Sequence, residues 1–329
     1  PPVVALCSLQ ARDHLQYHVM LRAKSSIEVV NKEDYGPETD FLRRSPALTE
    51  IARESLIYDR ITASIIGEKI FEEPHYRPDF ALKVLDNEQI VSFMAGHVDE
   101  EKTGWIKVFA THPKSRRRGY AKALLKELEG RFRLEGASKI RTMDCVPNYL
   151  SAGVDPRYTE AIALFERNGY TKVDDRVDML CPLDQDLSTE QEEERLARMG
   201  LTVRRITEPD QDSLFDMVEK HWPSWRYECR NGIQNNPSSI HVAVDGDRVA
   251  AFSVYEGNNK GIGWFGPMGT DPEYRGRKIG EVLLKRCLED IRNLGHGEAI
   301  IPWVGPIPFY LNTVNAHVFR VYWVYEKNL

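Results

Sequence analysis

One basic, glycine-containing segment occurs twice in this chain, at residues 116–121 and again at 275–280. The two copies read RRRGYA and RGRKIG, and they begin 159 residues apart. The same spacing relates two further pairs of residues, Asp86 with Asp245 and Phe93 with Phe252. A spacing held over three landmarks indicates an internal duplication, so we expect two domains of one architecture.

Each basic segment stands between a short apolar run and an apolar stripe of helical period. We therefore expect strands at 105–111 and 264–269, each followed by the basic loop and then by a helix. The first backbone N–H groups of a helix lack intrahelical partners and carry positive potential. Each loop is therefore a candidate cradle for a pyrophosphate group.

The rest of the chain predicts alternating strands and helices around these landmarks. We expect further strands at 26–30, 80–85, 90–97, 139–145, 172–180, 201–205, 241–244, 248–255, 299–303 and 317–325. We expect helices at 11–23, 49–67 (one or two), 121–132, 159–168, 210–221, 279–291 and 308–313. The strand expected at 172–180 would close the first domain.

These elements predict an α/β (α+β) fold of two tandem domains, each a mixed, largely antiparallel central sheet flanked by helices. We expect an N-terminal extension at 1–25, domains at 26–183 and 201–329, and a linker helix at 184–200. By pattern Phe165 corresponds to Tyr310, only 145 residues later. The first copy therefore carries about 14 extra residues, which we place at 147–156.

Composition narrows the function classes. The net charge of −6 argues against a nucleic-acid partner and suits an amine-bearing substrate. The five cysteines form no C-x-x-C pair, so neither a disulfide framework nor a metal site is indicated. No apolar run approaches the ~18 residues that span a bilayer. We expect a cytoplasmic monomer or homodimer, without a membrane partner.

The strand, the loop and the helix, with a later helix that carries Phe309-Tyr310, resemble the GNAT superfamily of acetyl-CoA-dependent N-acetyltransferases. The first loop fits the family pattern at Arg116, Gly119 and Ala121. The second fits at Arg275 and Gly280, but Lys278 stands where the family has its first glycine. Because Lys278 opens a helix, we expect ordinary backbone angles there and weakened rather than abolished CoA binding.

Two local marks resemble the tandem two-domain members that include bacterial glucosaminide (amino-sugar) acetyltransferases. One is Pro147-Asn148-Tyr149 followed by Gly153-Val154-Asp155, and the other is Trp303 with Phe309-Tyr310. Ser151-Ala152 precede Gly153 here, where those relatives usually have a proline.

The resemblance implies that the loops bind the CoA pyrophosphate, that the preceding strands pair with pantetheine, and that Tyr310 is the general acid for the CoA thiolate. Phe165 holds the corresponding position in the first copy and cannot donate a proton. We therefore expect catalysis in the C-terminal half. The N-terminal half would bind CoA, shape the substrate cleft or be degenerate. The implied cofactor-binding residues are Phe109, Ala110, Thr111, Arg116, Arg117, Arg118, Gly119, Tyr120, Ala121, Met268, Gly269, Thr270, Arg275, Gly276, Arg277, Lys278, Ile279 and Gly280.

The favoured function is transfer of acetyl from acetyl-CoA to a primary amine of a small polar acceptor, with an amino sugar favoured. Two alternatives stay open: an inactive acyl-CoA-binding or sensing protein, and an acetyltransferase acting on protein amines. Candidate general bases are His221, His241, Glu256 and Glu298. Candidates for stacking on a sugar are Trp222, Trp225, Trp264 and Trp303.

Overall fold

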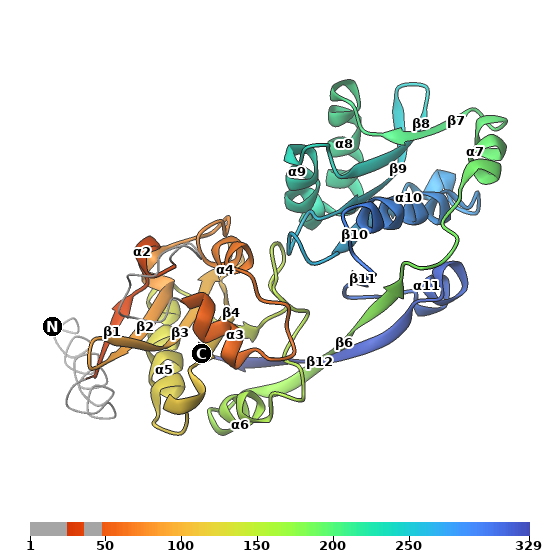
Figure 1. Ribbon diagram of the computed structural model, residues 1–329. Coiled ribbons are helices and arrows are strands. Elements are labelled where there is room, and N and C mark those ends of the chain that lie inside the picture. Colours follow the sequence, from red (N-terminus) through yellow and green to blue (C-terminus); the bar gives the residue numbers. More distant parts are fainter. Residues whose placement is uncertain (1–24, 36–47) are drawn as a thin grey trace, which may run out of the picture. The chain divides into compact units, whose positions relative to one another are not determined.

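The computed structural model describes residues 25–35 and 48–329 (Figure 1). The expected N-terminal extension, with its helix at 11–23, lies outside these residues apart from Ser25. The described chain forms two compact units. The first contains the described residues up to Cys145, with residues 156–174 and 323–329. The second contains residues 146–155 and 175–322.

The first unit is built on an antiparallel run of four strands, to which a fifth is added in parallel. These strands are β1 (Ser25–Val29), β2 (Ala81–Asp86), β3 (Gln89–Val98), β4 (Thr103–Thr111) and β5 (Lys139–Thr142). Its helices are α2 (Lys32–Tyr35), α3 (Leu48–Ser55), α4 (Ala63–Ile70), α5 (Tyr120–Leu134) and α6 (Thr159–Arg167). Phe132 of α5 packs directly onto the sheet because Gly96 and Gly104 beneath it have no side chain.

The second unit repeats this plan with an antiparallel sheet in the order β10-β9-β8-β7. Its strands are β7 (Leu201–Arg205), β8 (Ile240–Asp245), β9 (Arg248–Tyr255), β10 (Phe265–Thr270) and β11 (Glu298–Ile301). Its helices are α7 (Glu190–Ala197), α8 (Gln211–His221), α9 (Arg226–Gln234), α10 (Ile279–Asn293) and α11 (Ile307–Val314). The helices α8 and α9 cover one face of the β7–β10 sheet and α10 covers the other (Figure 1).

Two long strands, β6 (Thr171–Pro182) and β12 (His317–Asn328), contribute residues to both units. The order of the larger sheet is β1-β2-β3-β4-β5-β12-β6-β11. The end of β12 pairs with β5, and the end of β6 pairs with β11. The sequence pattern indicated that the strand at 172–180 would close the first domain. In the structure the last strand of the chain lies beside β5 instead.

The expected duplication and the α/β fold class are confirmed. Helices α5 and α10 begin and end 159 residues apart, and so do β5 and β11. After the extra segment the spacing shortens, and β6 and β12 begin 146 residues apart. Helix α9 was not expected from the sequence.

Candidate active site

The two basic loops follow the same backbone path. Each begins from an extended arginine, with ψ of 161° at Arg116 and 159° at Arg275. Each then enters the left-handed region twice. The first loop does so at Arg117 (φ 63°) and Gly119 (φ 88°). A turn of this kind can direct successive N–H groups toward one anion.

The second loop is left-handed at Gly276 (φ 78°) and Lys278 (φ 60°, ψ 26°). The expectation of ordinary backbone angles at Lys278 was therefore wrong. Each loop has one glycine and one larger residue at its two left-handed positions, in opposite order. The path of the loop, rather than the residue type, therefore requires left-handed angles at these positions. Lys278 is strained in this conformation, whereas Gly119 is not.

Both loops lead directly into a helix. Gly119 is the N-cap of α5 and Lys278 is the N-cap of α10, and neither provides a side-chain cap. The Ala123 N–H donates to the Gly119 carbonyl (2.9 Å) as the first bond of α5. The N–H groups that precede it are therefore available to an anion.

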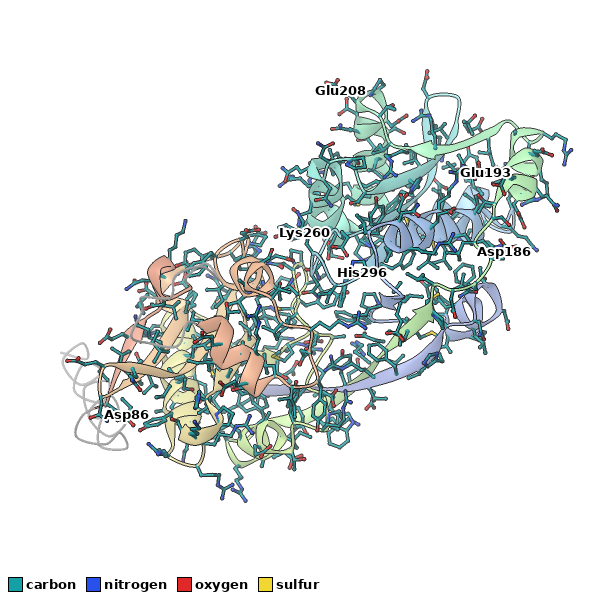
Figure 2. All side chains as sticks on the ribbon, viewed as in Figure 1. Asp86, Asp186, Glu193, Glu208, Lys260 and His296 are labelled. Carbon is teal, nitrogen blue, oxygen red and sulfur yellow. The ribbon has the colours of Figure 1, made fainter. Side chains whose placement is uncertain are left out.

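The arginines of the two loops make different contacts. Arg116 donates to the carbonyls of Thr111 (3.4 Å) and Ser55 (3.3 Å), which fastens the first loop to the end of β4. Arg118 pairs with Asp86 at the end of β2 (3.4 Å), and Asp86 is labelled in Figure 2. In the second loop, Arg275 and the Lys278 side chain are exposed, while the Arg277 guanidinium lies 4.8 Å above the Tyr274 ring.

The strand before each loop has an open edge. Residues of an antiparallel pair alternate between bonding their partner and pointing away from it. The Asp271 N–H donates to the Ala250 carbonyl (3.0 Å), so Gly269 faces β9 while Met268 and Thr270 face outward. No strand among the described residues pairs along this edge of β10.

The same holds in the first unit. The His112 N–H donates to Val91 (2.9 Å), so Ala110 faces β3 while Phe109 and Thr111 point away. The pairing of β4 with β5 ends at Ile106. In residues 109–111 and in residues 268–270, which we expected to bind the cofactor, two N–H groups therefore point outward and one bonds the neighbouring strand.

The units differ at the bulge in this strand. In β4 the bulged residue is Lys107, which is buried and forms an ion pair with Glu73. The corresponding bulge in β10 contains Gly266 (φ 113°), and the space where a Cβ would lie is empty within 4 Å. The bulge of the second unit is therefore open where that of the first holds a charged side chain.

Tyr310 lies on α11 and is 9% exposed. Its ring centroid is 6.3 Å from that of Phe265, at the start of β10, and 5.0 Å from that of Phe309. A Cβ built on Gly280 would lie 3.7 Å from Met268 and 3.8 Å from Phe309. Loop, open strand edge and α11 therefore meet at one place in the second unit.

Burial raises the pKa of Tyr310 to about 12, which keeps its hydroxyl protonated at neutral pH. Among the residues that the structure describes, none is hydrogen-bonded to this hydroxyl. Phe165, at the corresponding position, is fully buried between the rings of Phe109 (5.5 Å), Tyr170 (5.2 Å) and Tyr325 (6.0 Å).

The four candidate bases have different surroundings. His241 Nε2 lies 2.6 Å from Asp290, which Arg205 also binds (2.7 Å). Glu256 accepts hydrogen bonds from the N–H groups of Gly261, Gly263 and Trp264, and burial raises its pKa. His221 Nε2 lies 3.8 Å from Asp271, and Glu298 is an exposed residue of β11.

The four tryptophans form two groups. The rings of Trp222 and Trp225 stack at 5.1 Å and pack against Phe252 in the core under α8 and α9. Trp264 and Trp303 instead flank Tyr149, at 5.9 and 5.5 Å. Tyr149 comes from the extra segment of the first copy and was not among the expected site residues. Its position between two candidate tryptophans becomes visible only in the fold.

Within residues 25–35 and 48–329, no three His, Cys, Asp or Glu side chains gather as metal ligands would. None of the helices described there is long and apolar enough to cross a bilayer.

The model of the Acetyltransferase (GNAT) family matches the sequence twice, over residues 46–170 and 202–310, and so covers more than half of the chain. No curated protein matched. Solved structures with the same fold include a tandem GNAT protein from the clavulanic acid biosynthesis pathway (TM-score 0.64, 14% identity), covering 92% of this chain and 98% of that one.

A GCN5-related N-acetyltransferase from Sphaerobacter thermophilus matches with a TM-score of 0.67 and 17% identity, over 94% of this chain and 96% of that one. The glucosamine N-acetyltransferase region of a fungal multi-domain GH3 β-N-acetylglucosaminidase matches with a TM-score of 0.74 and 17% identity. That match covers 93% of this chain but only 38% of the fungal chain. At these identities the likeness is one of fold.

Proposed function

Because the chain belongs to the GNAT acetyltransferase family and carries two copies of its domain, we propose that it transfers acetyl from acetyl-CoA to a primary amine. The acceptor is a small polar molecule, favoured as an amino sugar, and the second unit carries out the transfer. The glucosamine N-acetyltransferase region of the fungal structure supports this acceptor class. The cysteines are scattered, and the four that the structure describes are free and buried, which suits a cytoplasmic enzyme.

One observation carries the proposal: in the second unit the basic loop, the open edge of β10 and the buried Tyr310 meet. The N–H groups of residues 276–280 bind the pyrophosphate of the substrate acetyl-CoA. The outward groups of Met268 and Thr270 pair with its pantetheine. The open bulge at Gly266 leaves room for the acetyl group and the approaching amine.

The transfer itself needs little from the protein beyond position and one proton. The neutral amine forms the new carbon–nitrogen bond as the carbon–sulfur bond breaks, and the amine nitrogen loses its extra proton to water or a base. Tyr310 gives its hydroxyl proton to the departing thiolate. Burial keeps this hydroxyl protonated until the transfer and makes it a weaker acid than the thiol, so its proton moves only as the carbon–sulfur bond breaks. The proton that the amine loses restores the hydroxyl afterwards.

The first unit keeps the loop that binds acetyl-CoA but not the catalytic parts. Phe165 has no proton to donate, and Lys107 with Glu73 fills the bulge. We propose that this unit binds CoA without catalysing transfer.

The alternative of an inactive acyl-CoA-binding protein draws on Lys278, a strained residue in the one loop that Tyr310 accompanies. The variant Tyr310→Phe distinguishes an acetyltransferase from an inactive binding protein. Release of free thiol from acetyl-CoA is measured with glucosamine, polyamines, aminoglycosides and amino acids. We expect kcat to fall about 10²-fold or more, with the KM for acetyl-CoA within about threefold, because only proton donation is lost.

Tyr170→Phe, a buried tyrosine of the first unit, is the matched control and should keep the wild-type rate. Unchanged turnover in Tyr310→Phe would remove the proposed acid. A wild-type protein that acetyl-CoA stabilises against heat, but that acetylates no amine, would favour the binding protein.

A further inference from the structure

Tyr149 is a buried tyrosine whose hydroxyl has no protein partner. It is 9% exposed, and no residue in the described part of the chain is hydrogen-bonded to its side chain. The hydroxyl oxygen itself keeps contact with solvent, while the ring that carries it is enclosed. A hydroxyl that reaches solvent from an enclosed ring, and that bonds no protein group, can bond a ligand in place of water.

The backbone of Tyr149 is held firmly. Its carbonyl accepts hydrogen bonds from the side-chain amides of Asn258 (3.1 Å) and Asn259 (3.3 Å). Asn259 also donates to the next carbonyl, that of Leu150 (3.2 Å). Both asparagines are fully buried. The extra segment is thus fastened to the second unit and presents Tyr149 at a fixed place.

Two tryptophans flank this tyrosine. The Trp264 ring is tilted by 59° to that of Tyr149, and the Trp303 ring is nearly perpendicular to it at 80°. Trp303 is partly exposed and has a left-handed backbone (φ 46°), which is costly for a bulky residue. Its N–H donates to Asp178 (2.9 Å), which also accepts from the Tyr322 hydroxyl (2.7 Å).

This aromatic cluster adjoins the proposed site of transfer. Trp264 immediately precedes β10, and the next residue, Phe265, contacts Tyr310. The open bulge at Gly266 follows. An acceptor lying against the cluster can therefore bring its amine to the bulge, where the acetyl group is proposed to lie.

The geometry points to an acceptor subsite formed by Tyr149, Trp264 and Trp303 that takes a hydroxylated six-membered ring bearing a primary amine. This inference rests on the proposed function. The Tyr149 hydroxyl bonds a ring hydroxyl, and the apolar face of the sugar packs on the exposed part of Trp303. The guanidinium of Arg176 lies 5.0 Å above the Trp303 ring and covers one of its faces.

The charge around the cluster suits such a ligand. The pKa of Tyr149 is raised well above its usual value, chiefly by burial and further by the carboxylates of Glu228 and Asp178. Their negative field favours an acceptor that arrives as an ammonium ion.

Tyr149→Phe removes only the hydroxyl, and two primary amines that share a six-membered ring test what it does. Glucosamine offers ring hydroxyls, whereas cyclohexylamine offers none. We expect Tyr149→Phe to raise the KM for glucosamine about tenfold and to leave kcat/KM for cyclohexylamine within about twofold. Trp303→Leu should weaken the binding of both substrates, because it removes the surface on which both of them pack. Tyr170→Phe again serves as the control.

Equal losses for both amines in Tyr149→Phe, or no loss for either, would overturn the subsite. Titration of intrinsic tryptophan fluorescence with glucosamine tests binding without turnover, and we expect Tyr149→Phe to bind about tenfold more weakly. If no amine is acetylated but glucosamine binds in this way, the proposed function fails and the subsite stands. If other amines are acetylated but glucosamine neither binds nor reacts, the subsite fails alone.

Discussion

At the scale of single residues, the two basic loops share one backbone path but have their strained, non-glycine left-handed residue at different positions. The first loop has Arg117 at its first left-handed position and the second has Gly276 there. At the second position the first loop has Gly119 and the second has Lys278. A Cβ on either glycine would meet no atom within 4 Å, so the cost at these corners is conformational rather than a clash.

We predict that Lys278→Gly stabilises the protein by about 0.5–1 kcal/mol. Relief of a left-handed residue is worth roughly 1–2 kcal/mol, and the greater freedom of glycine in the unfolded chain takes back part of this. Thermal unfolding without ligand measures the change. Lys278→Ala is the control, because it removes the long side chain and keeps the Cβ. Equal shifts in both variants would mean that the side chain, not the backbone, sets the stability.

The geometry at Lys278 shows what sequence reasoning could and could not supply. A lysine carries no signal for a left-handed backbone, and its place at a helix opening indicated ordinary angles. The available signal was the 159-residue spacing, which aligns Lys278 with Gly119. The grouping of Trp264 and Trp303 about Tyr149 had no comparable signal, because long-range packing brings the three together.

At the scale of elements, most strands and helices followed from the hydrophobic period, and α9 shows where that fails. Its sequence, RYECRNGIQ, has few apolar residues and an internal glycine, which argues against a helix. In the structure Gly232 lies against Ile240 and Val254, where a Cβ would approach within 2.8 and 2.9 Å. Close packing on the sheet overrides the weak local preference, and no local pattern reveals it.

Helix α8 begins at a carboxylate that the sequence did not single out. Asp210 accepts hydrogen bonds from Arg204 (2.8 Å) and from the Thr207 N–H (2.8 Å) and hydroxyl (2.6 Å). The Arg204 hydrogen bond is the largest cause of the lowered pKa of Asp210. A folded-state pKa below the ordinary value contributes stability above about pH 4, which is lost as the pH falls below it.

We predict that Asp210→Asn destabilises the second unit by about 1–2 kcal/mol at pH 7, since it weakens the charge-assisted hydrogen bonds from Arg204 and Thr207. Urea unfolding followed by tryptophan fluorescence measures this, because Trp222 and Trp225 pack beside α8. The difference from wild type should narrow between pH 5 and pH 3.5. Asp212→Asn, two residues further on in the first turn of α8, should cost only a few tenths of a kcal/mol. A gap that stays constant with pH would show that the charge is not involved.

At the scale of the whole molecule, the chain's last strand completes the sheet of the first unit. Tyr325 is fully buried, and its N–H donates to Thr142 (3.2 Å). Glu326 accepts from Arg141 (3.1 Å), and Lys327 pairs with Glu129 (2.9 Å). The duplication made this hard to predict, because β6 and β12 are equivalent strands. Their patterns indicate strands but do not indicate which unit each one completes.

Because the last strand belongs to the sheet of the first unit, a substitution near the C-terminus should destabilise the N-terminal unit. Tyr325→Ala removes a fully buried ring that stacks with Phe165. This should lower the free energy of unfolding by about 3–5 kcal/mol. Hydrogen exchange resolved by peptide locates the effect: protection should fall in β5 and α6, while β8 and β9 keep theirs. Val321→Ala on the same strand, in the second unit and 42% exposed, is the control and should change little. Because Tyr325 and β8 belong to different units, faster exchange confined to β7–β10 would contradict the assignment of the last strand to the first unit. Equal loss of protection throughout would instead mean that the two units unfold as one.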